Sequence, residues 1–104
     1  MTMLIRFVRM TFQEDRLTDF LAIFEASKAQ IRAFPGCHHL ELLRDLDQPN
    51  VRMTHSRWES PDTLEAYRQS DLFRTTWAAT KVLFADKPLA FSTETVEIVT
   101  VASA

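Results

Sequence analysis

Three side chains that bind transition metals stand next to one another in the segment GCHHLEL, where Cys37 precedes His38 and His39. Alternate residues of an extended strand point to opposite faces, so the two histidines diverge and do not converge on one ion. The sequence therefore predicts no metal site at this triplet. Cys37, at the start of a strand, is interpreted as a small apolar residue rather than a nucleophile.

The histidines are better candidates for acid–base chemistry. Segments 38–46 and 50–59 are predicted to form a hairpin. Apolar residues recur at every second position in each segment, and this spacing predicts one face that carries both His38 and His55. The predicted face consists of His38, Leu40, Leu42, Val51, Met53, His55 and Arg57. It offers no carboxylate as a third metal ligand, but imidazoles titrate near neutral pH, so either histidine is a candidate catalytic base. The alternative is that both are hydrogen-bonded residues of a pocket wall or an interface.

Aromatic residues at helical spacing could form the walls of a binding site for a flat ring. Tyr67 and Trp77 lie ten residues apart in the sequence. Tyr67 could donate a hydrogen bond to a phenolic oxygen or orient it. The predicted substrate-binding walls are Phe20, Phe24, Phe73 and Trp77. Rings at these spacings are equally typical of an ordinary helix packed on a sheet, and this alternative stays open.

Periodicity and turn residues predict the elements that must position these side chains. Strands are expected over 3–12, 38–46, 50–59 and 89–101, and helices over 14–33 and 60–84. Pro35 and Gly36 end the first helix. Ser60 and Pro61 begin the second helical region, and Ser70 predicts a break within it.

This order, β-α-β-β-α-β, predicts an α+β fold of the ferredoxin-like class with a four-stranded antiparallel sheet and helices on one face. Residues 1–104 are expected to form a single domain. Phe7, Leu43, Trp58 and Phe91 cannot all face the helices, so the other face of the sheet is expected to be apolar. Because exposed apolar faces mark interfaces, we expect a homodimer that joins two sheets into a dimeric α+β barrel.

Composition narrows the classes of partner. The 104 residues carry a net charge of −2 with a single cysteine, and the basic residues form no run or stripe. We therefore expect no nucleic-acid partner. The N-terminus lacks the pattern of a signal peptide, and no apolar run approaches the ~20 residues of a membrane span. The expectation is a cytoplasmic protein without a membrane partner.

Three segments together carry a resemblance to a known family: FPGCHHLELLRD, DQPNVRMTHSRWES and WESPDTLEAYRQSDLFRTTW. In their order and turn residues they resemble the antibiotic biosynthesis monooxygenase family, over nearly the whole chain. The resemblance implies a dimeric α+β barrel. It also implies one of three kinds of member: oxygenases that attack phenols or quinols with O₂ and no prosthetic group, haem-degrading enzymes, or proteins of unassigned activity.

The haem-degrading branch of this family has a residue pattern that this sequence does not resemble. That pattern has an Asn in the first strand, a Trp on the second helical segment and, ten residues beyond, a His that ligates iron. Here the first strand contains no Asn, Tyr67 stands in place of the Trp, and Trp77 stands in place of the His. Haem degradation is therefore not expected, because the iron would lack its protein ligand.

Two functions remain as expectations. The first is a monooxygenase without cofactor that oxidises a small phenolic, quinol or polycyclic aromatic substrate with O₂. In that case His55 or His38 is the catalytic base, and Tyr67 is its hydrogen-bonding partner at the substrate. The second is a non-catalytic dimer that binds a small molecule or serves as a stress-associated module. No motif in the sequence decides between them.

Overall fold

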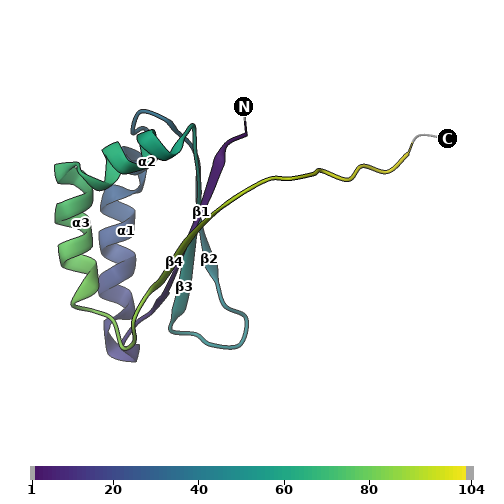
Figure 1. Ribbon diagram of the computed structural model, residues 1–104. Helices are drawn as coiled ribbons and strands as arrows, with labels where there is room; N and C mark the ends of the chain where they lie inside the picture. The colour runs from purple at the N-terminus through teal and green to yellow at the C-terminus, as the bar shows by residue number, and fades with distance from the viewer. Residues whose placement is uncertain (1, 103–104) are drawn as a thin grey trace.

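The computed structural model describes residues 2–102 and shows an α+β fold with a four-stranded antiparallel sheet in the order β2-β3-β1-β4 (Figure 1). The elements are β1 (Leu4–Thr11), a 3-10 turn η1 (Glu14–Arg16), α1 (Leu17–Arg32), β2 (Cys37–Arg44), β3 (Val51–Trp58), α2 (Pro61–Arg68), α3 (Asp71–Lys81) and β4 (Leu89–Glu94). The predicted ferredoxin-like class is confirmed.

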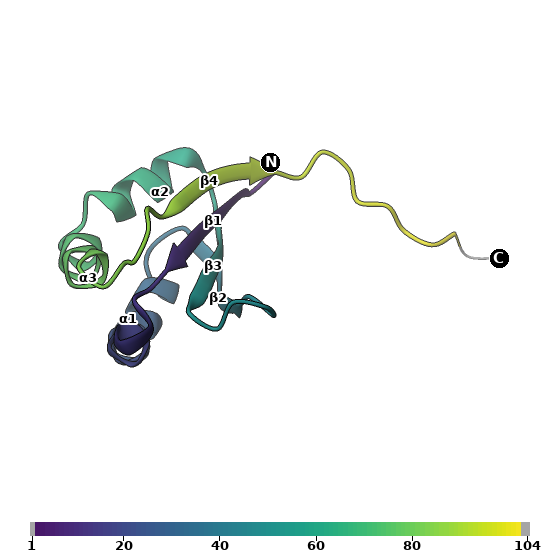
Figure 2. The same ribbon diagram turned by 90° about the horizontal axis from the view of Figure 1, so that it is seen from below.

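All helices lie on one side of the sheet, and the other side is left without a covering layer (Figures 1 and 2). The main core lies between sheet and helices, where Met10, Phe12, Phe20 and Leu83 are buried together. We call the uncovered side the open face; its side chains come from Ile5, Phe7, Arg9, His39, Glu41, Leu43, Met53, His55, Arg57, Leu89, Phe91 and Thr93. The open face is therefore a mixture of apolar and polar residues.

The β2–β3 register differs from the predicted one. Glu41 pairs with His55, and Leu42 pairs with Thr54. Residues of equal parity therefore share a face, whereas the prediction combined even positions of β2 with odd positions of β3. The predicted face joining Leu40 and Leu42 to His55 is wrong by one residue. The turn explains the difference, because Asp45 accepts hydrogen bonds from the backbone of Asp47 and Gln48 and sets where pairing begins.

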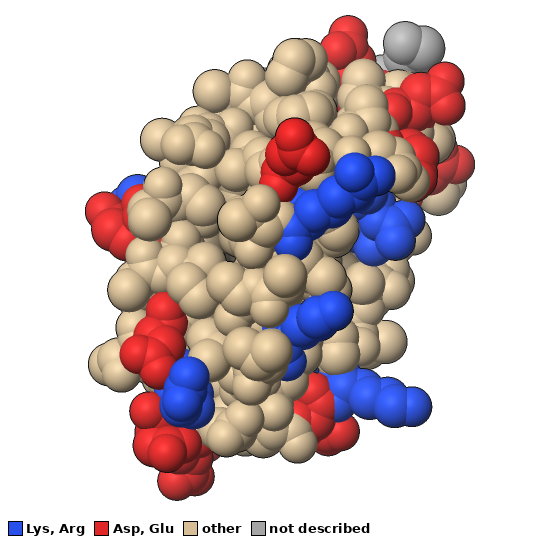
Figure 3. Space-filling model, turned by 90° about the vertical axis from the view of Figure 1, so that its left-hand side faces the viewer, with Lys and Arg blue, Asp and Glu red and all other residues tan. Residues whose placement is uncertain are grey.

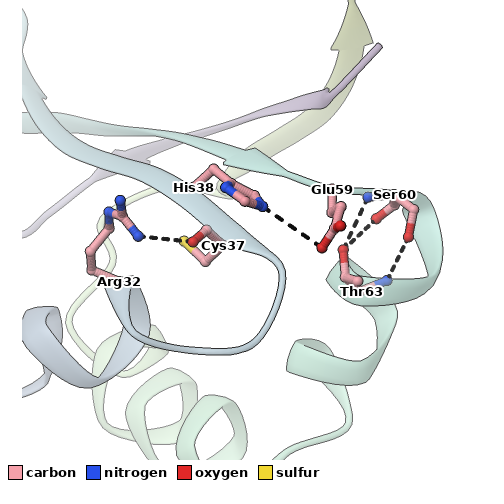
Figure 4. A network of polar contacts seen from close by, with 6 residues as sticks. All are labelled: Arg32, Cys37, His38, Glu59, Ser60 and Thr63. Atoms are coloured by element: carbon pink, nitrogen blue, oxygen red, sulfur yellow. Dashed lines mark hydrogen bonds and ion pairs between the residues drawn. The ribbon is translucent and has the colours of Figure 1, made fainter. Parts of the chain in front are cut away.

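An irregularity between Cys37 and His39 affects the start of β2. The register shifts there, so that Cys37 lies opposite Trp58 while His39 lies opposite Arg57. His38 occupies the shift itself, and its Nε2 lies 3.7 Å from Glu59 Oε2 (Figure 4). A bulge of this kind redirects side chains locally. It separates His38 from His55, which lies in the regular part of β3.

The last strand is shorter than predicted. β4 ends at Glu94, which lies opposite Leu4, the first residue of β1. Beyond Glu94, β1 offers no residue for further pairing. Residues 95–102, here called the arm, extend away from the body of the protein (Figures 1 and 2). The arm exposes the apolar residues Val96, Ile98, Val99 and Val101.

The second helical region is divided as the sequence predicts. Ser60 accepts a hydrogen bond from the backbone N–H of Thr63, and Thr63 Oγ1 accepts one from the backbone N–H of Ser60, a reciprocal cap (Figure 4). Ser70 then caps α3 by accepting from the N–H of Phe73. Each cap satisfies backbone donors that the helix itself cannot, so α3 can begin in a new direction with only two residues between it and the end of α2.

The surface over the helices carries acidic and basic side chains interspersed (Figure 3). Ion pairs three residues apart along the helical segments are Arg16–Asp19, Lys28–Glu25 and Arg68–Glu65. Pairs this exposed each contribute only about 0.3–0.5 kcal/mol. Within residues 2–102, no helix has both the length and the apolar character that crossing a bilayer requires.

The turn before β2 depends on a glycine. Gly36 has a φ of +89°, and a Cβ there would lie 2.5 Å from Thr63 Cβ. We predict that Gly36→Ala lowers the free energy of unfolding by about 2–4 kcal/mol, from backbone strain and overpacking. Ser60→Ala, which removes the cap without a clash, should cost about 1 kcal/mol. Urea denaturation checks both values, and a smaller loss for Gly36→Ala than for Ser60→Ala would contradict the argument.

Candidate functional site

A cavity of about 280 Å³ lies between the sheet and the helices. Its lining residues come from all four strands and all three α-helices: Arg6, Val8, Met10, Phe20, Ile31, Leu40, Thr54, Ser56, Trp58, Leu64, Tyr67, Arg68, Phe73, Thr76, Trp77, Thr80 and Ala90. The strands contribute the residues of even number, because that parity faces the helices. The cavity is therefore a direct product of the strand register.

Aromatic rings form a continuous wall of this cavity. Tyr67 stacks on Trp58 with ring centroids 4.9 Å apart and meets Phe73 edge-on at 5.3 Å. Phe73 in turn lies nearly parallel to Trp77, at 5.9 Å and 10°. Because α2 and α3 meet at the Ser70 cap, rings from both helices reach the same wall. Flat walls of this kind suit an aromatic ligand.

The structure brings most, but not all, of the predicted wall residues together. Phe20, Phe73, Trp77 and Tyr67 line the cavity. Phe24 does not, although its ring centroid lies only 6.1 Å from that of Phe20. It lines a separate hollow at the outer edge between α1 and β2. Phe24 lies four residues after Phe20 on the same side of α1, about 6 Å further along the helix axis, and therefore outside the cavity.

Tyr67 is held in an apolar setting. Burial among Trp58, Phe73 and Phe34 raises the pKa of the Tyr67 phenol to about 12, with a smaller contribution from Cys37. The phenol therefore keeps its proton at neutral pH. Tyr67 can donate a hydrogen bond to a ligand oxygen, but it cannot serve as a base.

Two guanidinium groups supply the positive charge of the cavity. Arg6 on β1 and Arg68 at the end of α2 both line it. Burial lowers the pKa of Arg6, and the nearby charge of Arg68 lowers it further. Arg6 donates to Ser92 Oγ at 3.0 Å, while Arg68 pairs with Glu65 at 3.3 Å and is half-exposed. The ionisable residues of the lining are thus Arg6, Arg68 and Tyr67, with no carboxylate or imidazole among the described wall residues.

The predicted histidine bases lie elsewhere. His38 points toward Glu59 at the end of β3 (Figure 4). His55 lies on the open face, where its ring stacks on Phe7 at 5.0 Å. The sheet separates His55 from the cavity, so neither histidine reaches a ligand bound there. For His55 the physical reason is the one-residue difference in the hairpin register, and for His38 it is the bulge at the start of β2.

A polar cluster on the open face was missed by the sequence analysis. His55 Nδ1 makes a close contact with Glu41 Oε1, and His39 Nε2 lies 3.3 Å from the same oxygen. Hydrogen bonds from His55 and then His39 hold the pKa of the Glu41 carboxyl below its usual value. With the correct register, alternation along β2 and β3 would have placed these three residues on one face.

Arg6 and Arg68 were also missed, although the sequence holds a signal for Arg6. Arg6 shares parity with Val8 and Met10, whose side chains face the helices. An arginine within the buried side of a strand is unusual because burying its charge is costly without a partner. Arg68 had no comparable signal, since it lies at the end of a short helix beside Glu65.

Comparison with known proteins identifies one family and one fold. Residues 3–79 match the sequence profile described as antibiotic biosynthesis monooxygenase. No curated protein matches the chain.

Solved structures with the same fold include three bacterial proteins. A Caulobacter crescentus protein provisionally assigned as an antibiotic biosynthesis monooxygenase has 23% identity and a TM-score of 0.85, with 92% of each chain covered. A Bordetella bronchiseptica protein with the same provisional assignment has 23% identity and a TM-score of 0.82, covering 93% of this chain and 100% of its own. A Mycobacterium tuberculosis protein has 17% identity and a TM-score of 0.85, covering 94% and 99%. At these identities the likeness shows the fold.

Tyr67 is the only tyrosine of the chain, so tyrosinate absorbance reports on it alone. We predict that its ionisation in the folded protein occurs near pH 12 rather than at the ordinary value of 10.0. Because the folded-state pKa is raised, the neutral phenol stabilises the fold below about pH 10, and this contribution is lost as the pH rises toward about 12. Absorbance at alkaline pH, with circular dichroism to follow unfolding, measures both effects. A midpoint near pH 10 with the fold intact would show that the phenol is solvated.

Proposed function

The chain belongs to the antibiotic biosynthesis monooxygenase family, and from this premise we propose that it oxidises a small phenolic, quinol or polycyclic aromatic substrate with O₂ in the cavity between sheet and helices. The observation that carries the proposal is the aromatic wall of Tyr67, Phe73 and Trp77 beside the guanidinium of Arg6. An apolar slot with a cationic end suits an aromatic ring that bears an ionisable hydroxyl.

The proposed reaction draws its electrons from the substrate. An anthrone-like phenol, for example, has a ring methylene that becomes a carbonyl: CH₂ + O₂ gives C=O + H₂O. One oxygen atom enters the substrate, the other leaves as water, and the two methylene hydrogens end in that water. Electron transfer to O₂ is easier from the substrate anion than from the neutral molecule. The task of the protein is therefore to favour the anion in a site shielded from water.

Arg6 is the group best placed to favour the anion. Its charge is partly buried and has no carboxylate partner among the salt bridges of the described residues, whereas Arg68 is shared with Glu65. A phenolate or enolate beside Arg6 would restore favourable pairing of that charge and lower the substrate's own pKa. Since Arg68 is half-exposed, the released proton passes to solvent at that end of the cavity.

Tyr67 and the wall residues orient the substrate. The phenol of Tyr67 stays protonated, so it can donate a hydrogen bond to the oxygen that develops negative charge. Phe73 and Trp77 lie nearly parallel, and a substrate ring can stack against the surface they form. Phe20 closes the wall from α1.

A second function follows from the same lining. The described wall residues include no carboxylate or imidazole that could accept a proton, so the cavity is also suited to binding an aromatic anion without reaction. Such a protein would be stabilised by its ligand according to ligand concentration and affinity. A rise in melting temperature without consumption of O₂ or formation of product would favour this function over the monooxygenase.

The partner proposed for the open face is a second copy of the chain. Phe91 is 40% exposed and Leu89 58% exposed on that face. The arm adds apolar residues that its own sheet cannot pair, because β1 ends opposite Glu94. Two copies packed through their open faces would cover both surfaces, and each arm would be available to the other copy. This arrangement is the dimeric α+β barrel expected from the sequence.

The monooxygenase is tested by oxygen uptake with quinols, naphthols and anthrone-like phenols, using full-length protein treated with chelator and subtracting the rate of autoxidation. We predict uptake above background for at least one compound. Arg6→Gln should lower kcat/KM by about 10- to 100-fold, because a hydrogen-bonded charge is lost. Tyr67→Phe should lower it by about tenfold, because a neutral hydrogen bond is lost.

Arg57→Gln is the matched control for Arg6→Gln. Arg57 lies on a neighbouring strand but on the open face, so its loss should leave uptake unchanged. The double variant His38→Gln/His55→Gln should also retain activity, since neither imidazole lines the cavity. If the histidine variant were inactive and Arg6→Gln fully active, the base would be a histidine and the arginine mechanism would be wrong.

The homodimer is tested by light scattering coupled to size-exclusion chromatography. We predict a mass twice the 12.1 kDa of one chain for the intact protein. Phe91→Asp, or a chain ending at Glu94, should shift the equilibrium toward monomer because apolar contact area is lost. Val82→Asp is the control, since Val82 is 66% exposed but follows α3 on the helical side. A monomeric intact protein at micromolar concentration would rule out the barrel.

A further inference from the structure

A second group of chemically competent side chains lies outside the cavity. His39 and Glu41 on β2 and His55 on β3 gather on the open face, and we call these three residues the triad. One ligand atom from each can be chosen so that all three lie within 4.8 Å of one another. His39 Nε2 and Glu41 Oε1 are 3.3 Å apart, and His55 Nδ1 contacts the same oxygen. The proposed monooxygenase gives these residues no role.

The strands hold the triad in place. Glu41 lies directly opposite His55, and His39 is the next residue of β2 on the same face. The His55 ring is packed on one side by stacking on its cross-strand neighbour Phe7, which itself stacks on Phe91. His55 is 14% exposed, whereas His39 and Glu41 are each 42% exposed. One ligand is therefore held rigidly, whereas the other two are only partly covered within the single chain.

We propose that the triad is a binding site for a divalent transition metal ion. Two imidazoles and one carboxylate form a ligand set that zinc and iron(II) use in proteins, leaving further coordination positions for water or a small ligand. The sequence analysis did not predict such a site, because it placed His38 rather than His39 with His55 and found no carboxylate on that face. The observed register supplies both the missing carboxylate and the second histidine.

The spacing of the ligand atoms fits this proposal. Two atoms each about 2.1 Å from a tetrahedral zinc ion are about 3.4 Å apart. The 3.3 Å between His39 Nε2 and Glu41 Oε1 already meets this value. The widest pair, within 4.8 Å, has to close by about 1 Å, which rotation of the exposed His39 side chain allows. The other oxygen of Glu41 remains available, so the carboxylate can move outward from His55 to admit the ion.

Arg57 is a nearby group whose positive charge opposes a cation. It lies opposite His39 on the same face of the sheet. Its charge should weaken the binding of a cation without removing a ligand. We therefore expect Arg57→Gln to strengthen metal binding, although Arg57 itself coordinates no metal. A histidine cluster that bound metal only nonspecifically would respond to the loss of any histidine and would not depend on Glu41.

The test is titration of the chelator-treated full-length chain with Zn²⁺ by isothermal calorimetry. One ion per chain is expected, with affinity reduced by about 100-fold or more in His39→Gln and in Glu41→Gln. His38→Gln is the matched control, because His38 also lies near a carboxylate, Glu59 at 3.7 Å, but without a second histidine. It should bind Zn²⁺ as the unaltered protein does. Substitution by Co²⁺ should give visible absorption bands that Glu41→Gln loses.

A loss of Zn²⁺ binding can be distinguished from unfolding and from a failure of the proposed function. His39 and Glu41 are partly exposed, so their variants should keep the circular dichroism spectrum of the unaltered protein. Glu41→Gln should also keep the chelator-resistant oxygen uptake, because it does not line the cavity. Equal loss of Zn²⁺ binding in His38→Gln, or full binding in folded Glu41→Gln, would overturn the site. All three ligands come from one chain, so the site does not depend on a residue of the second copy.

Discussion

The alternation of side chains along the paired strands β2 and β3 is the constraint on which the rest of the structure depends. Glu41 opposite His55 and Leu42 opposite Thr54 divide the hairpin into two chemically different faces. The even positions face the helices and build the wall of the cavity, and the odd positions form the open face. A shift by one residue would exchange these roles, because the side-chain period of a strand is two. The turn at Asp45 and the bulge at His38 therefore influence which side chains line the cavity, although neither residue lines it.

The break between α2 and α3 is the second device that shapes the cavity. In a single straight helix, Tyr67 and Trp77 would be rotated by about 1,000° relative to each other, which is almost three full turns. They would also lie about 15 Å apart along the helix axis. The Ser70 cap lets the chain turn, so that Tyr67, Phe73 and Trp77 form one continuous aromatic wall. Tyr67 is thereby packed against Trp58 on the sheet, which explains why its phenol is poorly solvated and hard to ionise.

The sequence was sufficient for the fold class, because helical and strand periods and the turn residues Gly36 and Ser60 act locally. It was sufficient for most of the aromatic wall for the same reason: Phe20, Phe73 and Trp77 lie on the inner sides of amphipathic helices. The hairpin register could not be read in this way, since apolar residues occur on both faces of β2 and β3. The end of β4 could not be predicted from the sequence either, because it depends on the length of β1 and not on residues 95–101 themselves.

The distribution of charge gives the two faces separate chemistry. The cavity holds the guanidinium groups of Arg6 and Arg68 and a phenol that keeps its proton, while the carboxylate and imidazoles of the triad lie beyond the sheet. In the proposed function, a cavity with only positive and neutral groups would stabilise an anion but accept no proton, so the substrate would reach its reactive state by losing a proton to water. That requirement favours substrates whose hydroxyl or activated methylene is already acidic. Acidic phenols and anthrone-like compounds meet it, and simple alcohols or alkanes do not.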